Sequence, residues 1–261
     1  MPEWFFDSYE MPGRRMNRSR GIEIYPEGIY DIALMIKEKY NNIPWFVSEN
    51  GIGIEGEEKF IKEILYPQLV SQNIFIEPVT VCNKVEKNGK RHKGGYTPYS
   101  SIKKQIKNFL GDSSLTYVTT MFDYYALYED FPGMDSPISG KAYEKVAFLE
   151  DKLKSDIGDR RFIPYIQLHE FESLLFSSLD GISNFTSNQV IINEFQSIIT
   201  QYPNPEDINN SPETAPSKRI EKIIKGYRKP LHGISILKNI EFQEILNKCP
   251  HFSEWINKIS N

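Results

Sequence analysis

Apolar residues recur at helical spacing in segments 26–40, 57–70 and 99–110 of the chain. In segment 57–70, Phe60, Ile61, Ile64 and Leu65 share one face, and acidic residues occupy the first turn. A stripe of this kind is typical of a helix that packs on a core, and early acids favour a helix N-terminus. The pattern therefore predicts three helices here, and residues 140–155 predict a fourth.

Short apolar runs alternate with these helices. They cover residues 43–48, 74–82, 115–122 and 162–168, and Pro78 breaks the second run. Runs of β-branched and aromatic residues are typical of strands, whereas a proline weakens one. The alternation from about residue 44 onward predicts an α/β sheet domain. An irregular arm is predicted for residues 1–21, and an exposed loop for the basic, glycine-rich segment 83–98.

The composition narrows the class of protein. The 261 residues carry a formal net charge of −4, with 39% apolar and 25% charged residues, as in a globular protein with a core. Cys82 and Cys249 fit no metal-ligand spacing, so we expect two reduced thiols in a cytoplasmic protein. No charged-then-apolar leader and no run of 18 apolar residues occurs, which predicts neither a signal peptide nor a membrane span. The mild acidity argues against broad nucleic-acid binding and leaves a local basic channel open.

Residues 1–60 contain three long strings, WFFDSYEMPGRRMN, EIYPEGIYDIAL and IPWFVSENGIGIEGEEKF. They resemble the later part of glycoside hydrolase family 1, in its 6-phospho-β-glucosidase branch. The resemblance implies that residues 1–54 are a fragment of TIM-barrel origin, with Glu49 of the Ser-Glu-Asn-Gly motif as the nucleophile. Retaining glycosidases need a second carboxyl group about 5 Å away, and the barrel needs eight strand–helix units. Because the family's Asn-Glu-Pro acid motif is absent from the sequence, we expect an inactive fragment.

Residues 52–258 contain a second set of strings, which include EGEEKFIKEILYPQL, VTTMFDYYALYEDFPG, RFIPYIQLHEFESLLF, PETAPSKRI and GYRKPLHG. They resemble family 4276 of the domains of unknown function, in the family's order and over almost its whole length. That family is similar to the Toprim fold, so the resemblance implies a mostly parallel sheet flanked by helices over residues 55–261. It also implies magnesium-dependent chemistry on nucleic-acid phosphodiesters, beside an ATPase of the ABC/SMC type in anti-phage defence.

The resemblance to the Toprim fold implies two kinds of carboxylate. Glu55 and Glu58 follow the first strand and are the candidates for general acid–base catalysis. Asp123, Glu170 and Glu172 follow later strands and are the candidate magnesium ligands. Their positions suit these roles because α/β sheets place ligands at the carboxyl ends of their strands, and magnesium prefers oxygen ligands.

The predicted metal site departs from the family pattern at one point. The sequence has Asp-Tyr-Tyr from residue 123 where the family has two aspartates separated by one residue, and Asp130 is the alternative second acid. His169 is a further candidate ligand. Glu170 and Glu172 are two positions apart, so an extended backbone would place them on one face.

Basic residues are candidates for phosphate binding. Lys218 and Arg219 could hold a phosphate, since arginine binds phosphate oxygens in bidentate fashion. Lys93 precedes Gly94 and Gly95, and such a glycine-containing loop could closely approach a phosphate group. The basic run 84–93 is predicted to be a solvated loop, with nucleic-acid contact as the alternative.

Three functional hypotheses follow. The first is a magnesium-dependent, nuclease-like or phosphoryl-transfer subunit that acts on nucleic acid with an ATPase partner. The second is a 6-phospho-β-glucosidase, from the intact Ser-Glu-Asn-Gly motif. The third is a non-catalytic interaction subunit, which the missing second aspartate favours. Metal binding separates the first hypothesis from the third, and hydrolysis of a chromogenic phospho-glucoside would reveal the second.

Overall fold

The computed structural model of the chain describes residues 15–17, 22–24, 56–79, 81, 84–85, 91–92, 98–124, 127–136, 140–208 and 214–260. The chain divides into two compact units, Met1–Ile52 and Gly53–Asn261. In the first unit, β1 (Arg15–Asn17) pairs with β2 (Ile22–Ile24) in antiparallel fashion, so the arm predicted to be irregular contains a strand. The predicted helix 26–40 and strand 43–48 lie outside the described residues.

A parallel strand pair organises the second unit. The pieces are β5 (Val118–Thr119), β6 (Phe122–Asp123), β7 (Phe162–Ile163) and β8 (Ile166–Gln167). β5 pairs with β7 and β6 pairs with β8, both in parallel and in the same register. Between the pieces lies Pro164, which has no N–H for a ladder. There the Thr120 hydroxyl accepts a hydrogen bond from Tyr165 N (3.0 Å) and donates one to its carbonyl (3.1 Å). The predicted strands 115–122 and 162–168 are therefore confirmed, each broken in two.

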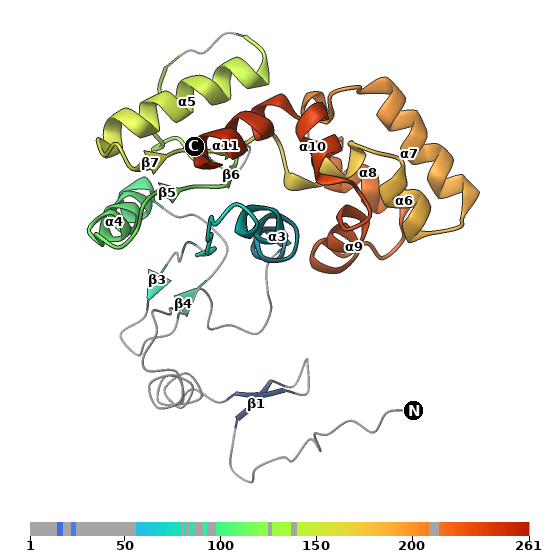
Figure 1. Cartoon of the computed structure of the whole chain (residues 1–261), viewed down its shortest axis with the longest axis horizontal. Coiled ribbons are helices and arrows are strands. Elements are labelled where there is room, and N and C mark those ends of the chain that lie inside the picture. Colours follow the sequence, from blue (N-terminus) through green and yellow to red (C-terminus); the bar gives the residue numbers. More distant parts are fainter. Residues whose placement is uncertain are drawn as a thin grey trace. The chain divides into compact units, whose positions relative to one another are not determined.

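Helix α5 (Ala142–Ile157) connects the two strands, and α4 (Tyr99–Leu110) precedes them, as the apolar spacing predicted. Figure 1 shows α4 beside β5 and α5 beside β7. Val146, Leu149 and Leu153 of α5 are fully buried with Phe162 and Ile166 of the strands. Because parallel strands need a long crossover connection, this strand–helix–strand arrangement is the α/β unit that the sequence predicted.

The rest of the second unit is helical. Helix α2 (Gly56–Phe60) continues through the π-helical turn η1 (Ile61–Leu65) into α3 (Tyr66–Val70), which confirms the helix predicted over 57–70. The later helices and helical turns are η3 (Phe171–Phe176), α6 (Asp180–Phe185), α7 (Gln189–Gln201), η4 (Pro205–Asp207), α8 (Pro216–Ile223), η5 (Lys229–Gly233), α9 (Ile234–Leu237), α10 (Phe242–Lys248) and α11 (Pro250–Ser260). Their apolar faces share one core with α2 and α3.

Helix α11 fastens this helical core to the strand pair. The Trp255 ring stacks on the Tyr165 ring at a centroid distance of 4.2 Å, and its Nε1 donates to the Thr119 hydroxyl at 2.8 Å. Both rings are almost completely buried. Stacked aromatic pairs stabilise a core beyond the area they bury. Helix α11 therefore links the strand pair to the helical core through one ring stack and one hydrogen bond.

Two predictions between α3 and α4 need correction. Residues 74–79 and 81, inside the predicted strand 74–82, form no ladder, and Pro78 lacks the N–H that a ladder needs. Within the predicted loop 83–98, β3 (Lys84–Val85) pairs with β4 (Arg91–His92) in antiparallel fashion. The basic segment therefore contains a short hairpin.

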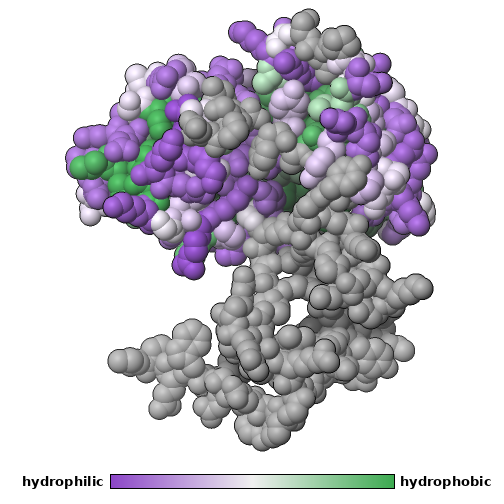
Figure 2. Space-filling view, turned by 180° about the vertical axis from the view of Figure 1, so that it is seen from behind, coloured by the Kyte–Doolittle hydropathy of each residue, from purple (hydrophilic) through white to green (hydrophobic). Residues whose placement is uncertain are grey.

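Polar side chains cover most of the coloured surface in Figure 2. A hydrophobic area lies at the left edge of Figure 2, which is the side of α7, because the half-turn between the views brings the right side of Figure 1 to the left. Val190 of α7 is 66% exposed. None of the helices in the described part of the chain has the length and apolar character that crossing a membrane requires.

Candidate functional site

The carboxyl ends of β6 and β8 bring predicted acidic residues to one edge of the strand pair. Asp123 ends β6 opposite Gln167 of β8, and Glu170 follows three residues later. Between them, His169 is buried and has a left-handed backbone with φ of 68°. Such a conformation is uncommon outside glycine and turns the chain sharply from β8 into η3. This is the edge at which α/β sheets place their ligands.

The first turn of α8 holds Glu170. Its Oε2 accepts a hydrogen bond from Ser217 N at 2.9 Å, and its Oε1 accepts one from Ser217 Oγ at 3.0 Å. The side chain is 6% exposed. Early N–H groups of a helix have no partner within the helix, so a carboxylate there is both satisfied and electrostatically favoured. Glu170 is thus fixed in position by an element far from it in sequence.

Lys229 stands between two further carboxylates. Its Nζ lies 2.6 Å from Glu57 Oε1 and 3.0 Å from Glu172 Oε2, and 4.8 Å from the centre of the Phe171 ring. Gly56 makes this approach possible, because a Cβ there would lie 2.8 Å from Lys229 Cγ and 3.0 Å from the Phe171 ring. We refer to Glu57, Asp123, Glu170, Glu172 and Lys229 as the lysine-centred acidic cluster.

Burial and charge shape the protonation of this cluster. Burial opposes the charged form of Lys229, but the carboxylates of Glu172, Glu57 and Asp123 outweigh it and raise the lysine pKa. Burial also raises the pKa of Glu172 to about 8, against the attraction of Lys229 and with added repulsion from Glu170. Glu172 is fully buried. The cluster therefore combines a permanent cation with a carboxyl group that changes charge near neutral pH.

The cluster has the type of oxygen donor that magnesium binds, but its carboxylates are not arranged around a common metal position in the described part of the chain. Carboxylate oxygens are the ligands that magnesium prefers. Glu172 Oε1 is buried and has no hydrogen-bond partner among the described residues. Lys229 contacts Glu57 Oε1 and Glu172 Oε2, and Ser217 donates to both oxygens of Glu170. No group of three or more His, Cys, Asp or Glu side chains arranged to hold a metal occurs in the part of the chain that the structure describes.

A match to a known protein family covers the second unit except for a few residues at its ends. Residues 55–260 match the family described as domain of unknown function (DUF4276). The chain belongs to the DUF4276 family. Every residue of the lysine-centred acidic cluster lies within the matched range.

A short segment of the chain is similar to glucosidases. It is 57% identical over 63 residues to 6-phospho-beta-glucosidase GmuD from Bacillus subtilis (strain 168), which is 24% of this chain and 14% of that protein. A chloroplastic benzoxazinyl glucoside beta-D-glucosidase (1b) from Triticum aestivum is 53% identical over 38 residues, 14% of this chain and 7% of that protein. The chain therefore spans only a small part of these curated relatives. No solved structure matches the chain.

Other predicted residues make contacts of their own or lie outside the described part of the chain. Glu58 is buried, and its Oε1 contacts Lys62 Nζ at 2.6 Å. Asp130 accepts a hydrogen bond from Tyr99 N at 2.7 Å at the start of α4, and its role as the second acid stays a prediction. The remaining predicted residues, Glu49, Glu55 and Lys93, lie outside the described residues.

The predicted phosphate-binding residues of the DUF4276 domain are engaged on α8. Lys218 is exposed and pairs with Glu221 at 2.7 Å. Arg219 donates to the Thr214 carbonyl at 2.8 Å and to the Tyr202 hydroxyl at 3.2 Å, and its guanidinium lies over the Tyr202 ring. Their phosphate role stays a prediction.

Sequence reasoning missed four residues at the site: Glu57, Ser217, Tyr227 and Lys229. The hydroxyl of Tyr227 is buried without a hydrogen-bond partner among the described residues. Burial raises the pKa of Tyr227, and the neighbouring Glu172 carboxylate raises it further. Gly233 leaves room for it, since a Cβ there would lie 2.6 Å from the Tyr227 oxygen. A signal existed, because Tyr227 and Lys229 lie in GYRKPLHG and Ser217 lies in PETAPSKRI, both strings that carry the family resemblance.

Proposed function

We propose that the DUF4276 domain of this chain is a metal-dependent, nuclease-like or phosphoryl-transfer subunit that acts on nucleic acid, with a Toprim-like arrangement of its sheet. The observation that carries the proposal is the lysine-centred acidic cluster at the carboxyl ends of two parallel strands. Strongly perturbed ionisable groups at such an edge are typical of a catalytic site.

Each residue of the cluster has a proposed role. Asp123, Glu170 and Glu172 would hold a magnesium ion, which would supply positive charge to a phosphate and to an attacking water. Lys229 provides a compact positive charge that suits a phosphate oxygen. Glu57 contacts Lys229 from α2 and joins Glu55 and Glu58 as a candidate for general acid–base catalysis.

The biological setting is proposed from the resemblance alone. We expect a cytoplasmic protein of bacterial defence that works with an ATPase of the ABC/SMC type. Residues 1–54 are proposed to descend from a TIM-barrel glycosidase, in keeping with the identity to the Bacillus subtilis glucosidase.

Calorimetric titration of the whole chain with Mg²⁺ and Mn²⁺ tests the metal site. We expect saturable binding that is at least tenfold weaker in Asp123→Ala and in Glu170→Ala, because each variant removes a carboxylate ligand. Asp180→Ala is the matched control, since Asp180 is exposed on α6. Absence of binding at millimolar metal in the wild type would contradict the proposal and favour the non-catalytic interaction subunit.

The second candidate function is that of a 6-phospho-β-glucosidase, favoured by the 57% identity over 63 residues. We expect no hydrolysis of a chromogenic 6-phospho-β-glucoside, because the Asn-Glu-Pro motif that supplies the acid in that family is missing from the sequence. Turnover that disappears in Glu49→Gln would overturn this expectation and assign the first unit its own activity.

A further inference from the structure

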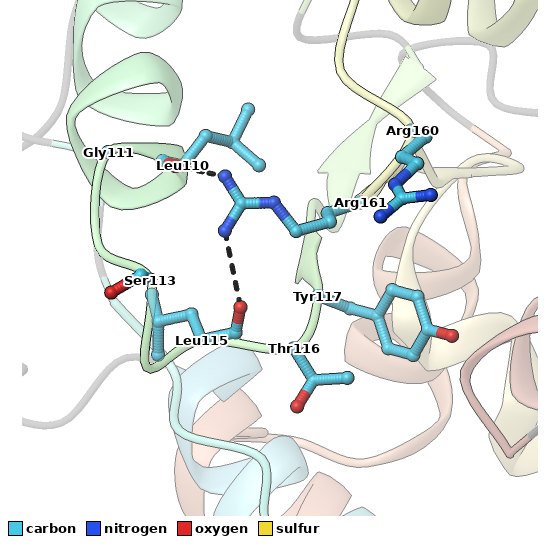
Figure 3. Close-up of a pocket in the computed structure, with 8 residues that line it drawn as sticks. All are labelled: Leu110, Gly111, Ser113, Leu115, Thr116, Tyr117, Arg160 and Arg161. Atoms are coloured by element: carbon cyan, nitrogen blue, oxygen red, sulfur yellow. Dashed lines mark hydrogen bonds between the residues drawn. The ribbon is translucent and has the colours of Figure 1, made fainter.

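A hollow of about 670 Å³ opens at the other end of the strand pair, at the amino ends of β5 and β7. Figure 3 shows the side chains that line it, from the end of α4, the loop that follows and the start of β7. They are Leu110, Gly111, Ser113, Leu115, Thr116, Tyr117, Arg160 and Arg161. The hollow is therefore separate from the lysine-centred acidic cluster.

Arg161 fixes the walls of the hollow. Its guanidinium donates to the carbonyl oxygens of Leu110, of Asp112 at 3.1 Å and of Leu115 at 3.4 Å, and it pairs with Asp159 at 3.2 Å. One side chain thus ties the end of α4 and the following loop to the start of β7. A ligand would meet a preformed site, which lowers the ordering cost of binding.

The electrostatics of the hollow suit an anion. The lining contains two arginines and no carboxylate. The nearest acids in the sequence are already engaged, because Asp112 accepts hydrogen bonds from Ser114 at 2.7 and 2.8 Å and Asp159 pairs with Arg161. Arg160 is exposed to solvent, so its charge remains accessible to a ligand.

An aromatic ring lies beside this charge. Tyr117 is 46% exposed although it carries a large aromatic ring. Figure 3 shows its ring and the Arg160 guanidinium facing the same space. Sites that bind single-stranded nucleic acid combine a cation for the phosphate with an aromatic ring on which a base stacks. Such stacking accepts any base, because every base has a flat face.

We propose that this hollow binds one nucleotide unit of single-stranded nucleic acid, with Arg160 on a phosphate and Tyr117 on the face of the base. This proposal rests on the proposed function and specifies that the nucleic-acid substrate of the domain is single-stranded. A duplex would not offer an unstacked base to one ring. Tyr117 and Asp123 lie six residues apart along an extended segment, a span of about 20 Å. The hollow and the acidic cluster therefore lie at opposite ends of the strand pair.

Fluorescence anisotropy tests the proposal in buffer with a chelator, so that its result does not depend on the metal site. The probe is a labelled oligothymidylate or oligouridylate, and a labelled thymidine monophosphate is the comparison. We expect Arg160→Glu and Tyr117→Ala to weaken oligonucleotide binding at least tenfold and about fivefold, respectively. Lys248→Glu is the matched control, because Lys248 is exposed on α10 and carries the same charge change; we expect its affinity to stay within twofold.

Each other outcome is decisive. Equal losses in Lys248→Glu and Arg160→Glu would reveal diffuse electrostatics and overturn the proposal, as would no oligonucleotide binding by the wild type. Thymidine monophosphate binding as tight as the oligonucleotide would assign the hollow to free nucleotides instead. Thermal unfolding of every variant checks that the fold persists, and Arg160→Gln, which adds no negative charge, must show the same direction of change. A wild type that binds metal but no oligonucleotide would retain the metal site and lose this inference.

Discussion

Lys229→Met is expected to lower the free energy of unfolding by about 2–4 kcal/mol, as loss of one partner of a buried ion pair does. Methionine keeps the unbranched stem that packs beside Gly56 and Phe171. What disappears is the charge that lies 2.6 Å from Glu57 and 3.0 Å from Glu172. Two acids then face each other with no cation between them. Urea unfolding at pH 9 with a chelator present, where Glu172 is ionised in the wild type, measures the effect.

Lys238→Met provides the matched comparison. Lys238 contacts Glu63 at 2.6 Å, but its side chain is 52% exposed. Surface ion pairs contribute little, so we expect a change within about 1 kcal/mol. Equal stability losses in the two variants would mean that Lys229 contributes only as an ordinary surface pair. In that case the lysine-centred acidic cluster would not be held together by its lysine.

The strand-end acids could be predicted from local sequence. Asp123 follows a run of β-branched and aromatic residues, and Glu170 follows another. Apolar runs joined by a helix form parallel strands, and parallel strands bring their carboxyl ends to one edge. The bounds of α4 were predicted for the same reason, because its apolar spacing is set within one helix. Even the break in the ladder follows from Pro164.

The partners of those acids could not be predicted in this way. Lys229 meets Glu57 and Glu172 only because η5 packs against α2 and η3, which depends on tertiary packing and not on any local pattern. Asp130 illustrates the converse, since it lies seven residues after the end of β6 yet accepts a hydrogen bond at the start of α4. The spacing of carboxylates in the sequence therefore predicts the composition of a site less well than the packing of the elements that carry the opposing charges.

Glu172→Gln is expected to become more stable relative to the wild type as the pH rises from about 4.5 to about 8. Burial raises the pKa of Glu172 from 4.5 to about 8, so the folded protein keeps a proton that the unfolded chain releases. The stability that the proton on Glu172 contributes is fully present below pH 4.5, and it is lost as the pH rises through 8. For one proton the slope is at most about 1.4 kcal/mol per pH unit. Urea unfolding at a series of pH values, with a chelator, measures the difference between the two proteins.

Glu63→Gln gives the opposite sign and serves as the control. The hydrogen bond from Lys238 lowers the pKa of Glu63, so the wild type gains stability relative to this variant as the carboxyl ionises. A flat difference for Glu172→Gln between pH 4.5 and 8 would mean that Lys229 keeps Glu172 ionised throughout. The cluster would then hold a permanent salt bridge in place of a titrating carboxyl group. A rising difference would instead establish that burial outweighs the neighbouring cation, and that Glu172 changes charge in the range where a catalytic acid–base group works.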